Sequence, residues 1–248
     1  MTYLGSKKRF TKYIVPIIQE TMKANGITTF VDAMCGGCNV IEKVKADRKI
    51  AMDLNECLIE LYRYALDGGE FPEKMTREDW DACKDHPETQ PKWKVALVEF
   101  FCSYLARGFS GGYSSKPRKS TGKTTYEERM GTFKKQLPNL ENIEFYVGDI
   151  FEEFPFHLDD KILIYLDPPY ENTKKYSIAK HFDYQRFWER ARELSREHMV
   201  LISSQVAPND FKVIWELETK ANLSSLNGRE MIDAIERLYV YEDGIILS

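Results

Sequence analysis

The chain has 248 residues, and its 35 Lys and Arg against 39 Asp and Glu give a formal net charge of −4. Hydrophobic residues make up 43% of it, which is typical of a globular protein and too apolar for a disordered one. No run of about 18 apolar residues occurs, which excludes a membrane span, and Met1–Arg9 lacks the apolar stretch of a signal peptide. The charge balance argues against non-specific coating of DNA but leaves room for a local basic patch.

The cysteines point to a reduced, cytoplasmic protein, because they are five in number and all lie in the first half of the chain. Cys35 and Cys38 have the spacing of half a zinc site or a redox pair. A structural zinc site needs four ligands, and the histidines offer no matching pair. We therefore expect no metal, and two small buried thiols in a turn.

The N-terminal part of the chain alternates helix and strand. The pattern predicts a helix over 8–25, kinked by Pro16 and ended by Asn25-Gly26. It then predicts strands over 28–34 and 48–54, followed by a helix over 57–66 with an apolar stripe.

Residues 68–140 break this alternation. Helices are expected over 79–85 and 93–105, and the stretch 107–123 has no periodicity and four glycines. A loop of that length inside a compact domain is usually functional or disordered.

The alternation resumes after residue 140. Strands are expected over 143–147, 161–166, 198–203 and 211–217, with a helix over 184–196. Two short apolar runs, 237–241 and 244–247, are separated by Glu242-Asp243 and predict a terminal hairpin. The repeated units predict an α/β fold, with a doubly wound, mostly parallel sheet and an antiparallel C-terminal hairpin.

Acidic residues follow three of the predicted strands. Asp32 precedes the small-residue turn Cys35–Cys38, Asp53 ends the second strand, and Asp149 follows the strand over 143–147. Ligands of such folds bind at the carboxyl ends of the strands, where an acid can accept hydrogen bonds from ribose hydroxyls. A tight connection with incidental glycines, and an N-cap at Asp149, are the alternatives.

The sequence Asp167-Pro168-Pro169-Tyr170 directly follows a continuous apolar strand. Prolines lack N–H groups and stiffen the backbone, so this segment presents carbonyl oxygens and one carboxylate. An acceptor-only pocket suits a planar amino group, and the Tyr170 ring offers a face for stacking. A simple strand-ending turn is the alternative.

A basic segment spans 116–135, where seven Lys and Arg face two Glu, for a net charge of +5. This asymmetry is typical of a phosphate-binding surface, and a solvated loop is the alternative. The candidate DNA contacts in and beside it are Arg107, Tyr113, Lys116, Arg118, Lys119, Lys123 and Arg129.

These motifs, in this order, resemble the Dam-like (D12 class) DNA adenine-N6 methyltransferases, in particular those of phages and prophages. The resemblance rests on Tyr3–Lys7, the turn at 32–40, Asp53, Ala106–Gly112, Asp149 and Asp167–Tyr170, and it extends to Phe187-Trp188, Ala207–Phe211 and Ile214-Trp215. It implies a Rossmann-like methyltransferase sheet of seven strands. It divides the chain into a catalytic domain, 1–67 and 141–248, and an inserted, mainly helical target-recognition region, 68–140.

The resemblance also implies the ligands. The cofactor would be S-adenosylmethionine, held by Tyr3, Gly5, Lys7, Asp32, Gly36, Asp53, Asp149 and Asp167. Asp167, Pro168, Pro169 and Tyr170 would be the catalytic residues and hold a flipped-out adenine. The partner would be double-stranded DNA, bound by a monomer, in a modification or restriction-modification role.

The turn departs from the family pattern of aromatic-x-Gly-x-Gly. Met34 replaces the aromatic residue, and Cys38 replaces the second glycine. Two alternatives therefore stay open: a cytosine-N4 methyltransferase, whose amine would fit a similar pocket, and a protein that binds S-adenosylmethionine or nucleic acid without turnover.

Overall fold

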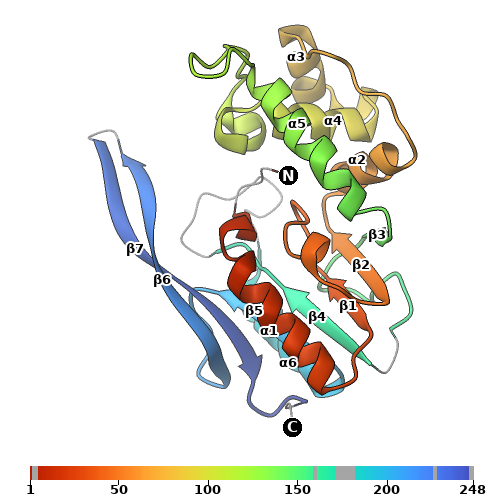
Figure 1. The fold of residues 1–248 in the computed structure, drawn as a ribbon, viewed down its shortest axis with the longest axis vertical. Helices are drawn as coiled ribbons and strands as arrows, with labels where there is room; N and C mark the ends of the chain where they lie inside the picture. The colour runs from red at the N-terminus through yellow and green to blue at the C-terminus, as the bar shows by residue number, and fades with distance from the viewer. Residues whose placement is uncertain (2–4, 159–160, 171–181, 226–227, 246–248) are drawn as a thin grey trace.

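The computed structural model describes residues 1, 5–158, 161–170, 182–225 and 228–245 (Figure 1). The chain forms a central twisted sheet with helices on both faces and a layer of helices stacked at one end.

Within the described residues, the sheet has seven strands in the order β3-β2-β1-β4-β5-β7-β6. Neighbours among the first five strands are parallel, whereas β7 is antiparallel to both β5 and β6. The strands are β1 (Thr29–Asp32), β2 (Arg48–Asp53), β3 (Ile143–Val147), β4 (Ile162–Leu166), β5 (Met199–Ser204), β6 (Phe211–Ser225) and β7 (Gly228–Tyr241). The predicted Rossmann-like, mostly parallel methyltransferase sheet is confirmed.

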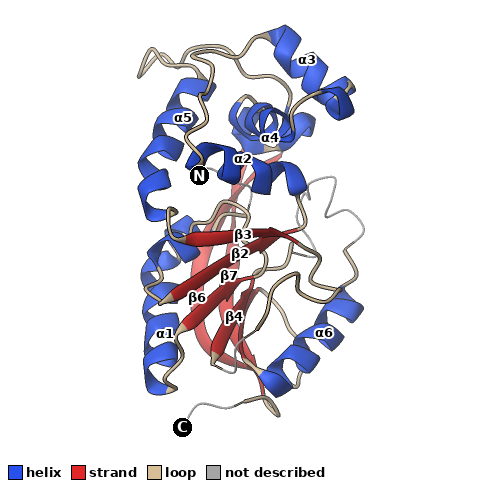
Figure 2. Ribbon diagram, turned by 90° about the vertical axis from the view of Figure 1, so that its right-hand side faces the viewer, coloured by secondary structure: helices blue, strands red, loops and turns tan. Residues whose placement is uncertain are grey.

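The central strands are apolar because both faces of the sheet are covered. Every residue of β4 is buried between β1 and β5, as expected for an inner strand of a parallel sheet. Helix α1 (Thr11–Ala24) covers one face and α6 (Tyr184–Glu197) covers the other (Figure 2). Alternate side chains of β4 accordingly enter two cores, Leu163 with Ile14 of α1 and Ile164 with Phe187 of α6.

The helical layer contains α2 (Glu56–Leu66), α3 (Arg77–Asp85), α4 (Lys92–Phe101) and α5 (Thr125–Gln136). Capping boxes start two of these helices, with Thr76 and Asp79 at α3 and Thr124 and Glu127 at α5. Buried residues of α2, α4 and α5 belong to the same core as those of α1, so the layer packs continuously onto one side of the sheet.

The helices differ from the predictions mainly at their ends. Helix α1 starts at Thr11 and continues through Pro16 to Ala24. Helix α4 ends at Phe101, earlier than predicted, and α5 was not predicted. Short 3-10 helices fill several connections: η1 (Lys7–Arg9), η2 (Ile41–Lys43), η3 (Pro87–Thr89), η4 (Tyr104–Ala106), η5 (Gly108–Gly111) and η6 (Leu137–Asn139).

The predicted terminal hairpin of 237–241 with 244–247 is wrong. Residues 237–241 belong to β7, whose hairpin partner is the preceding strand β6, and residues 246–247 lie outside the described part of the chain. Glu242-Asp243 follows the end of β7 in a turn. The distal parts of both strands were missed, because residues 218–225 are mostly polar and residues 228–236 show no strict alternation of apolar and polar residues.

Candidate active site

The carboxyl ends of β1, β2 and β4 bring three acidic residues to one edge of the sheet. Asp32 is the last residue of β1 and pairs in register with Ala51 of β2 and Tyr165 of β4. Asp53 ends β2, and Asp167 directly follows β4. Parallel strands end at the same edge, so the predicted acids gather as expected.

The turn after β1 is built on two residues in the left-handed region of backbone conformation. Gly36 has φ 43°, and Cys38, which stands where the family has glycine, has φ 56°. The Cys38 N–H donates to the carbonyl of Cys35 at 2.7 Å, and the Tyr62 hydroxyl donates to the carbonyl of Gly36 at 2.8 Å. Cys38 thus keeps the backbone conformation for which glycine is normally used.

Asp53 ties this turn to the second strand. Its carboxylate accepts hydrogen bonds from the backbone N–H groups of Gly36 and Asn55, both at 2.9 Å. Burial raises the pKa of Asp53, and the two N–H donors oppose that rise. The carboxylate is therefore held in place by backbone groups and retains lone pairs for a further donor.

Asp32 is only 2% exposed, and its Oδ1 atom has no hydrogen-bond partner among the described residues. Burial raises the pKa of Asp32 well above its usual value, and the neighbouring Asp167 and Asp53 add to this. A buried acceptor left without a donor is costly. The site thus offers an acceptor that a cationic or N–H donor of a ligand would satisfy.

Asp167 is part of a buried polar network that joins distant parts of the chain. The Lys7 Nζ atom lies 2.6 Å from Asp167 Oδ1 and donates to the Tyr170 hydroxyl at 2.6 Å. The Tyr170 hydroxyl donates to Glu236 of β7, which also accepts a hydrogen bond from the Ser203 hydroxyl of β5. One ammonium group therefore faces two carboxylates.

The charges of this network follow from its burial. Burial raises the pKa of Asp167 to about 6, while the Lys7 ammonium opposes the rise and Glu236 adds to it. Burial alone would lower the pKa of Lys7, but Asp167 and Glu236 together hold it above its usual value. Burial and both carboxylates raise the pKa of Tyr170 strongly, so its hydroxyl stays a proton donor.

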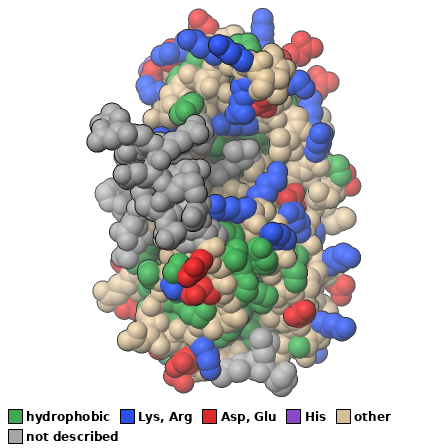
Figure 3. Space-filling view, turned by 60° about the vertical axis from the view of Figure 1, so that its left-hand side comes forward, with side chains coloured by type: hydrophobic (Ala, Val, Ile, Leu, Met, Phe, Trp, Pro, Cys, Tyr) green, Lys and Arg blue, Asp and Glu red, His purple; other side chains and the backbone are tan. Residues whose placement is uncertain are grey.

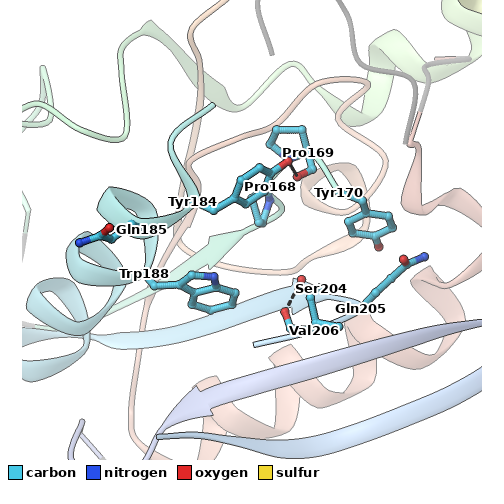
Figure 4. Close-up of a pocket in the computed structure, with 9 residues that line it drawn as sticks. All are labelled: Pro168, Pro169, Tyr170, Tyr184, Gln185, Trp188, Ser204, Gln205 and Val206. Atoms are coloured by element: carbon cyan, nitrogen blue, oxygen red, sulfur yellow. Dashed lines mark hydrogen bonds between the residues drawn. The ribbon is translucent and has the colours of Figure 1, made fainter. Parts of the chain in front are cut away.

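A pocket of about 180 Å³ opens beside the two prolines (Figure 4). Its lining combines the predicted catalytic segment with α6 and the end of β5: Pro168, Pro169, Tyr170, Tyr184, Gln185, Trp188, Ser204, Gln205 and Val206. The Tyr184 hydroxyl donates to the Pro169 carbonyl at 2.8 Å, and the Ser204 hydroxyl donates to the Val206 carbonyl at 2.7 Å. Aromatic rings of α6 and a stiff proline backbone thus frame one cavity.

The remaining predicted cofactor residues are more dispersed. Asp149 is partly exposed and caps the turn after β3, where its Oδ1 accepts from the Phe151 N–H at 3.0 Å. Gly5 is exposed with φ 79°. Tyr3 lies outside the described residues.

The predicted DNA contacts divide into exposed and buried groups. Lys116, Arg118, Lys119 and Lys123 are exposed, and Figure 3 shows Lys and Arg side chains gathered at that end of the molecule. Arg118 pairs with Glu128 at 3.0 Å, and Arg107 is partly buried.

Arg129 and Tyr113 serve the helical layer in this structure. Arg129 is 7% exposed and donates to the carbonyls of Phe100 and Ser103, so the prediction that it lies on the basic surface is wrong. The Tyr113 hydroxyl donates to the Met75 carbonyl at 2.7 Å. Both were predicted from charge and composition, which do not reveal burial.

The sequence predictions missed four residues of the site. Ser203 and Glu236 belong to the polar network, and Tyr184 and Trp188 line the pocket. Glu236 lies in a strand half that was not predicted. Tyr184 and Trp188 are four positions apart on α6, and this spacing places them on one helix face. That spacing was the available signal. Among the described residues, no group of three or more His, Cys, Asp or Glu is arranged to hold a metal ion, and no helix is long and apolar enough to cross a membrane.

The strand order, the antiparallel β7 and the acidic strand ends form a Rossmann-like fold of the methyltransferase type. Residues 3–92 match the family model of D12 class N6 adenine-specific DNA methyltransferases, which confirms the predicted resemblance. The match names adenine-N6 chemistry and does not favour the cytosine-N4 or the non-catalytic alternative.

Two curated proteins are similar in sequence. The modification methylase StsI of Streptococcus sanguinis is 27% identical over 193 residues, and the type II methyltransferase M.FokI of Planomicrobium okeanokoites is 25% identical over 189 residues. Each match covers 68% of this chain but only 28% of the relative. Among solved structures, the glycopeptide N-methyltransferase MtfA in complex with sinefungin is similar to this chain, with 8% identity and a TM-score of 0.32. The match covers 98% of this chain and 72% of the MtfA chain.

Proposed function

We propose that this protein is a site-specific DNA methyltransferase that transfers the methyl group of S-adenosylmethionine to the N6 amino group of a flipped-out adenine. The observation that carries the proposal is the position of Asp167-Pro168-Pro169-Tyr170. This segment lies between a pocket lined by aromatic rings and the acidic strand ends of β1 and β2. The names of the relatives support DNA modification as the role.

The acceptor groups at the strand ends fit S-adenosylmethionine. The unpartnered Oδ1 atom of Asp32 suits an ammonium group, and the backbone-anchored carboxylate of Asp53 suits ribose hydroxyls. Asp149, at the end of β3, would meet the adenine ring of the cofactor. When bound, S-adenosylmethionine supplies an electrophilic methyl group on a sulfonium centre.

The protein's own residues hold and activate the amine. Adenine N6 is a poor nucleophile because its lone pair is delocalised into the ring. In the proposed complex, the Asp167 carboxylate and the Pro168 carbonyl each accept a hydrogen bond from one N–H of the amine. Positive charge that develops on N6 is then stabilised by fixed acceptors. The Lys7 ammonium engages Asp167 Oδ1 and leaves Oδ2 for the amine.

Tyr170, Tyr184 and Trp188 supply the apolar faces that a flipped base needs. Unstacking a base from the duplex costs a few kcal/mol, and stacking on an aromatic ring returns about 1–3 kcal/mol. The cavity is smaller than the roughly 300–1,000 Å³ of pockets for drug-sized ligands, as expected for one planar base.

We further propose that the inserted part of the chain, residues 68–140, which contains α3, α4 and α5, is the target-recognition region. Its exposed Lys116, Lys119 and Lys123 carry positive charge that can meet phosphates.

The experiment is methyl transfer from tritiated S-adenosylmethionine to unmethylated plasmid DNA, followed by nucleoside analysis. We expect N6-methyladenine with the native chain and none with Asp167→Ala. Long-read sequencing of DNA from cells that express the chain would give the modified base and the recognition sequence together. Absence of N6-methyladenine in both assays, or its formation by the Ala variant, would contradict the proposal.

A further inference from the structure

Glu236 is a buried carboxylate at the candidate site that comes from the C-terminal hairpin. It is 3% exposed. On β7 it lies one residue before Arg237, the last position that pairs with β5, and it stands opposite Leu217 of β6. Glu236 therefore reaches the site from the point where β7 separates from the parallel part of the sheet.

Among the described residues, three groups contact this carboxylate. The Tyr170 hydroxyl donates to Oε2 at 2.6 Å and lies 2.7 Å from Oε1, the Ser203 hydroxyl donates to Oε1 at 2.6 Å, and Lys7 Nζ lies 3.5 Å from Oε1. A carboxylate removed from water needs such donors to offset its desolvation. The contacts belong to one network that continues through Lys7 to Asp167.

We propose that Glu236 is a positioning residue for the methyl-transfer reaction, which orients the Tyr170 ring through its hydroxyl and the Asp167 carboxylate through Lys7. The inference rests on the proposed function, because it assigns Tyr170 and Asp167 to the target base.

The chemistry of the Tyr170 hydroxyl explains why an acidic residue stands at position 236. The hydroxyl accepts a hydrogen bond from Lys7, so its single proton must point to an acceptor. A carboxylate only accepts, whereas an amide can also present its N–H groups. With the hydroxyl held by Lys7 and Glu236, and with Lys7 Nζ 4.4 Å from the ring centroid, the Tyr170 ring is oriented before the base arrives.

The charge of Glu236 also acts on Asp167. The groups that face Asp167 are Lys7 from η1, Tyr165 from β4, Tyr170 after β4, Glu236 from β7 and Asp32 from β1. Because Glu236 raises the pKa of Asp167, neutralising Glu236 lowers that pKa. A change in the pH profile of the reaction therefore reports the link between the two residues, which a purely structural role would leave unaltered.

The test compares Glu236→Gln, Tyr170→Phe and the double variant, with Glu216→Gln as the matched control. Glu216 is an exposed carboxylate of the same hairpin that pairs with Arg237. Single-turnover transfer from tritiated S-adenosylmethionine to unmethylated plasmid DNA is measured across pH, together with KM for DNA and the melting temperature. We expect a rate about 10- to 100-fold lower for either single variant, with KM for DNA within about threefold of native.

Two further results are expected if the residues act as a unit. The double variant should be no slower than the slower single variant, because both substitutions remove the same hydrogen bond. The acid limb of the Glu236→Gln profile should move to lower pH, while the Glu216→Gln variant matches the native chain in rate and profile.

A native rate in Glu236→Gln, additive losses in the double variant, or an unshifted acid limb would overturn the inference. If Glu236→Gln does not fold, Tyr170→Phe decides the question, because it keeps every charge and loses only the hydroxyl. Transfer by the native chain with unaffected variants would refute the inference alone. A native chain without transfer would refute the proposed function and the inference together.

Discussion

The Gly36 N–H donates to Asp53 Oδ2 at 2.9 Å, so the turn after β1 is tied to the end of β2 by a side chain. Any ligand that lies over this turn and hydrogen-bonds Asp53 meets two elements already held in one geometry. Asp53 therefore has two roles: it stabilises the turn through this bond, and it is the proposed acceptor for ribose hydroxyls.

Asp53→Ala should weaken S-adenosylmethionine binding. The variant loses the proposed ribose contact and the bond to Gly36, and hydrogen bonds to a charged group contribute about 1.5–3 kcal/mol. We expect the Kd, measured by calorimetry well below the melting temperature, to rise about 10- to 100-fold. An unchanged Kd would remove Asp53 from the cofactor site.

Asp167→Ala should nearly abolish methyl transfer while the fold persists. The side chain is 19% exposed and directly precedes Pro168 of the pocket lining, and its replacement removes the proposed acceptor for the reacting amine. Loss of one such preorganised group costs about 10²- to 10³-fold in rate in other enzymes. Single-turnover kinetics with circular dichroism as the folding control would check this, and retained activity would remove Asp167 from the reaction.

The rate of transfer should fall as the pH drops through about 6, because the pKa of Asp167 is raised to about 6 and only the carboxylate accepts a hydrogen bond from the amine. Lys7 holds that pKa down, so Lys7→Met should move the acid limb to higher pH. The same change leaves the buried Glu236 and the partly exposed Asp167 without their cation and should cost up to about 3–5 kcal/mol of stability. pH–rate profiles and urea unfolding measure the two effects, and an acid limb that stays in place would disprove the coupling.

Cys38 should tolerate glycine but not valine. The φ of 56° at Cys38 strains any L residue by about 1–2 kcal/mol, and a glycine would relieve this strain. Two effects oppose that gain, because the glycine variant loses a fully buried thiol and its unfolded chain has more conformational entropy. We expect Cys38→Gly within about 1 kcal/mol of native, and Cys38→Val to lose more than about 2 kcal/mol because a β-branched residue suits this region poorly. Urea unfolding compares the three chains, and equal stability of the Val variant would contradict the backbone argument.

Lys119→Glu combined with Lys123→Glu should weaken DNA binding and reduce its dependence on salt. Both side chains are exposed in the loop before α5. Each lost phosphate contact lowers the slope of log K against log salt by about 0.9 on duplex DNA. Binding titrations at several salt concentrations test this, with Lys23→Glu at the far end of α1 as a control. Identical slopes would place the loop outside the DNA interface.

Much of the fold was predictable because its signals are local. The continuous apolar run that forms β4 and the Asn25-Gly26 end of α1 lie within a few residues of the structure they specify. The same holds for the shared edge of Asp32, Asp53 and Asp167, because parallel strands end at one edge of the sheet, and these three lie close together because β1 has β2 and β4 as its neighbours.

The unpredicted parts depend on contacts between distant residues. Arg129 looked like a surface cation, yet its guanidinium satisfies carbonyls of α4 and the segment that follows. Glu236 gave no sign of function because its part of β7 shows no strict alternation of apolar and polar residues, and a sequence pattern does not show which residues a strand contacts across the sheet. The partners of a buried charge have to be read from the structure.

The network of Lys7, Tyr170 and Glu236 joins residues that the ribosome adds at different times. Lys7 leaves the ribosome before Glu236, and at translation rates of about 5–20 residues per second the two are separated by roughly 10–50 s. A nascent chain, or one terminated by a premature stop codon before β7, would carry the Asp-Pro-Pro-Tyr segment without the partner of its tyrosine. Such an incomplete chain would lack the proposed support for the Tyr170 ring, even where its parallel strands have already formed.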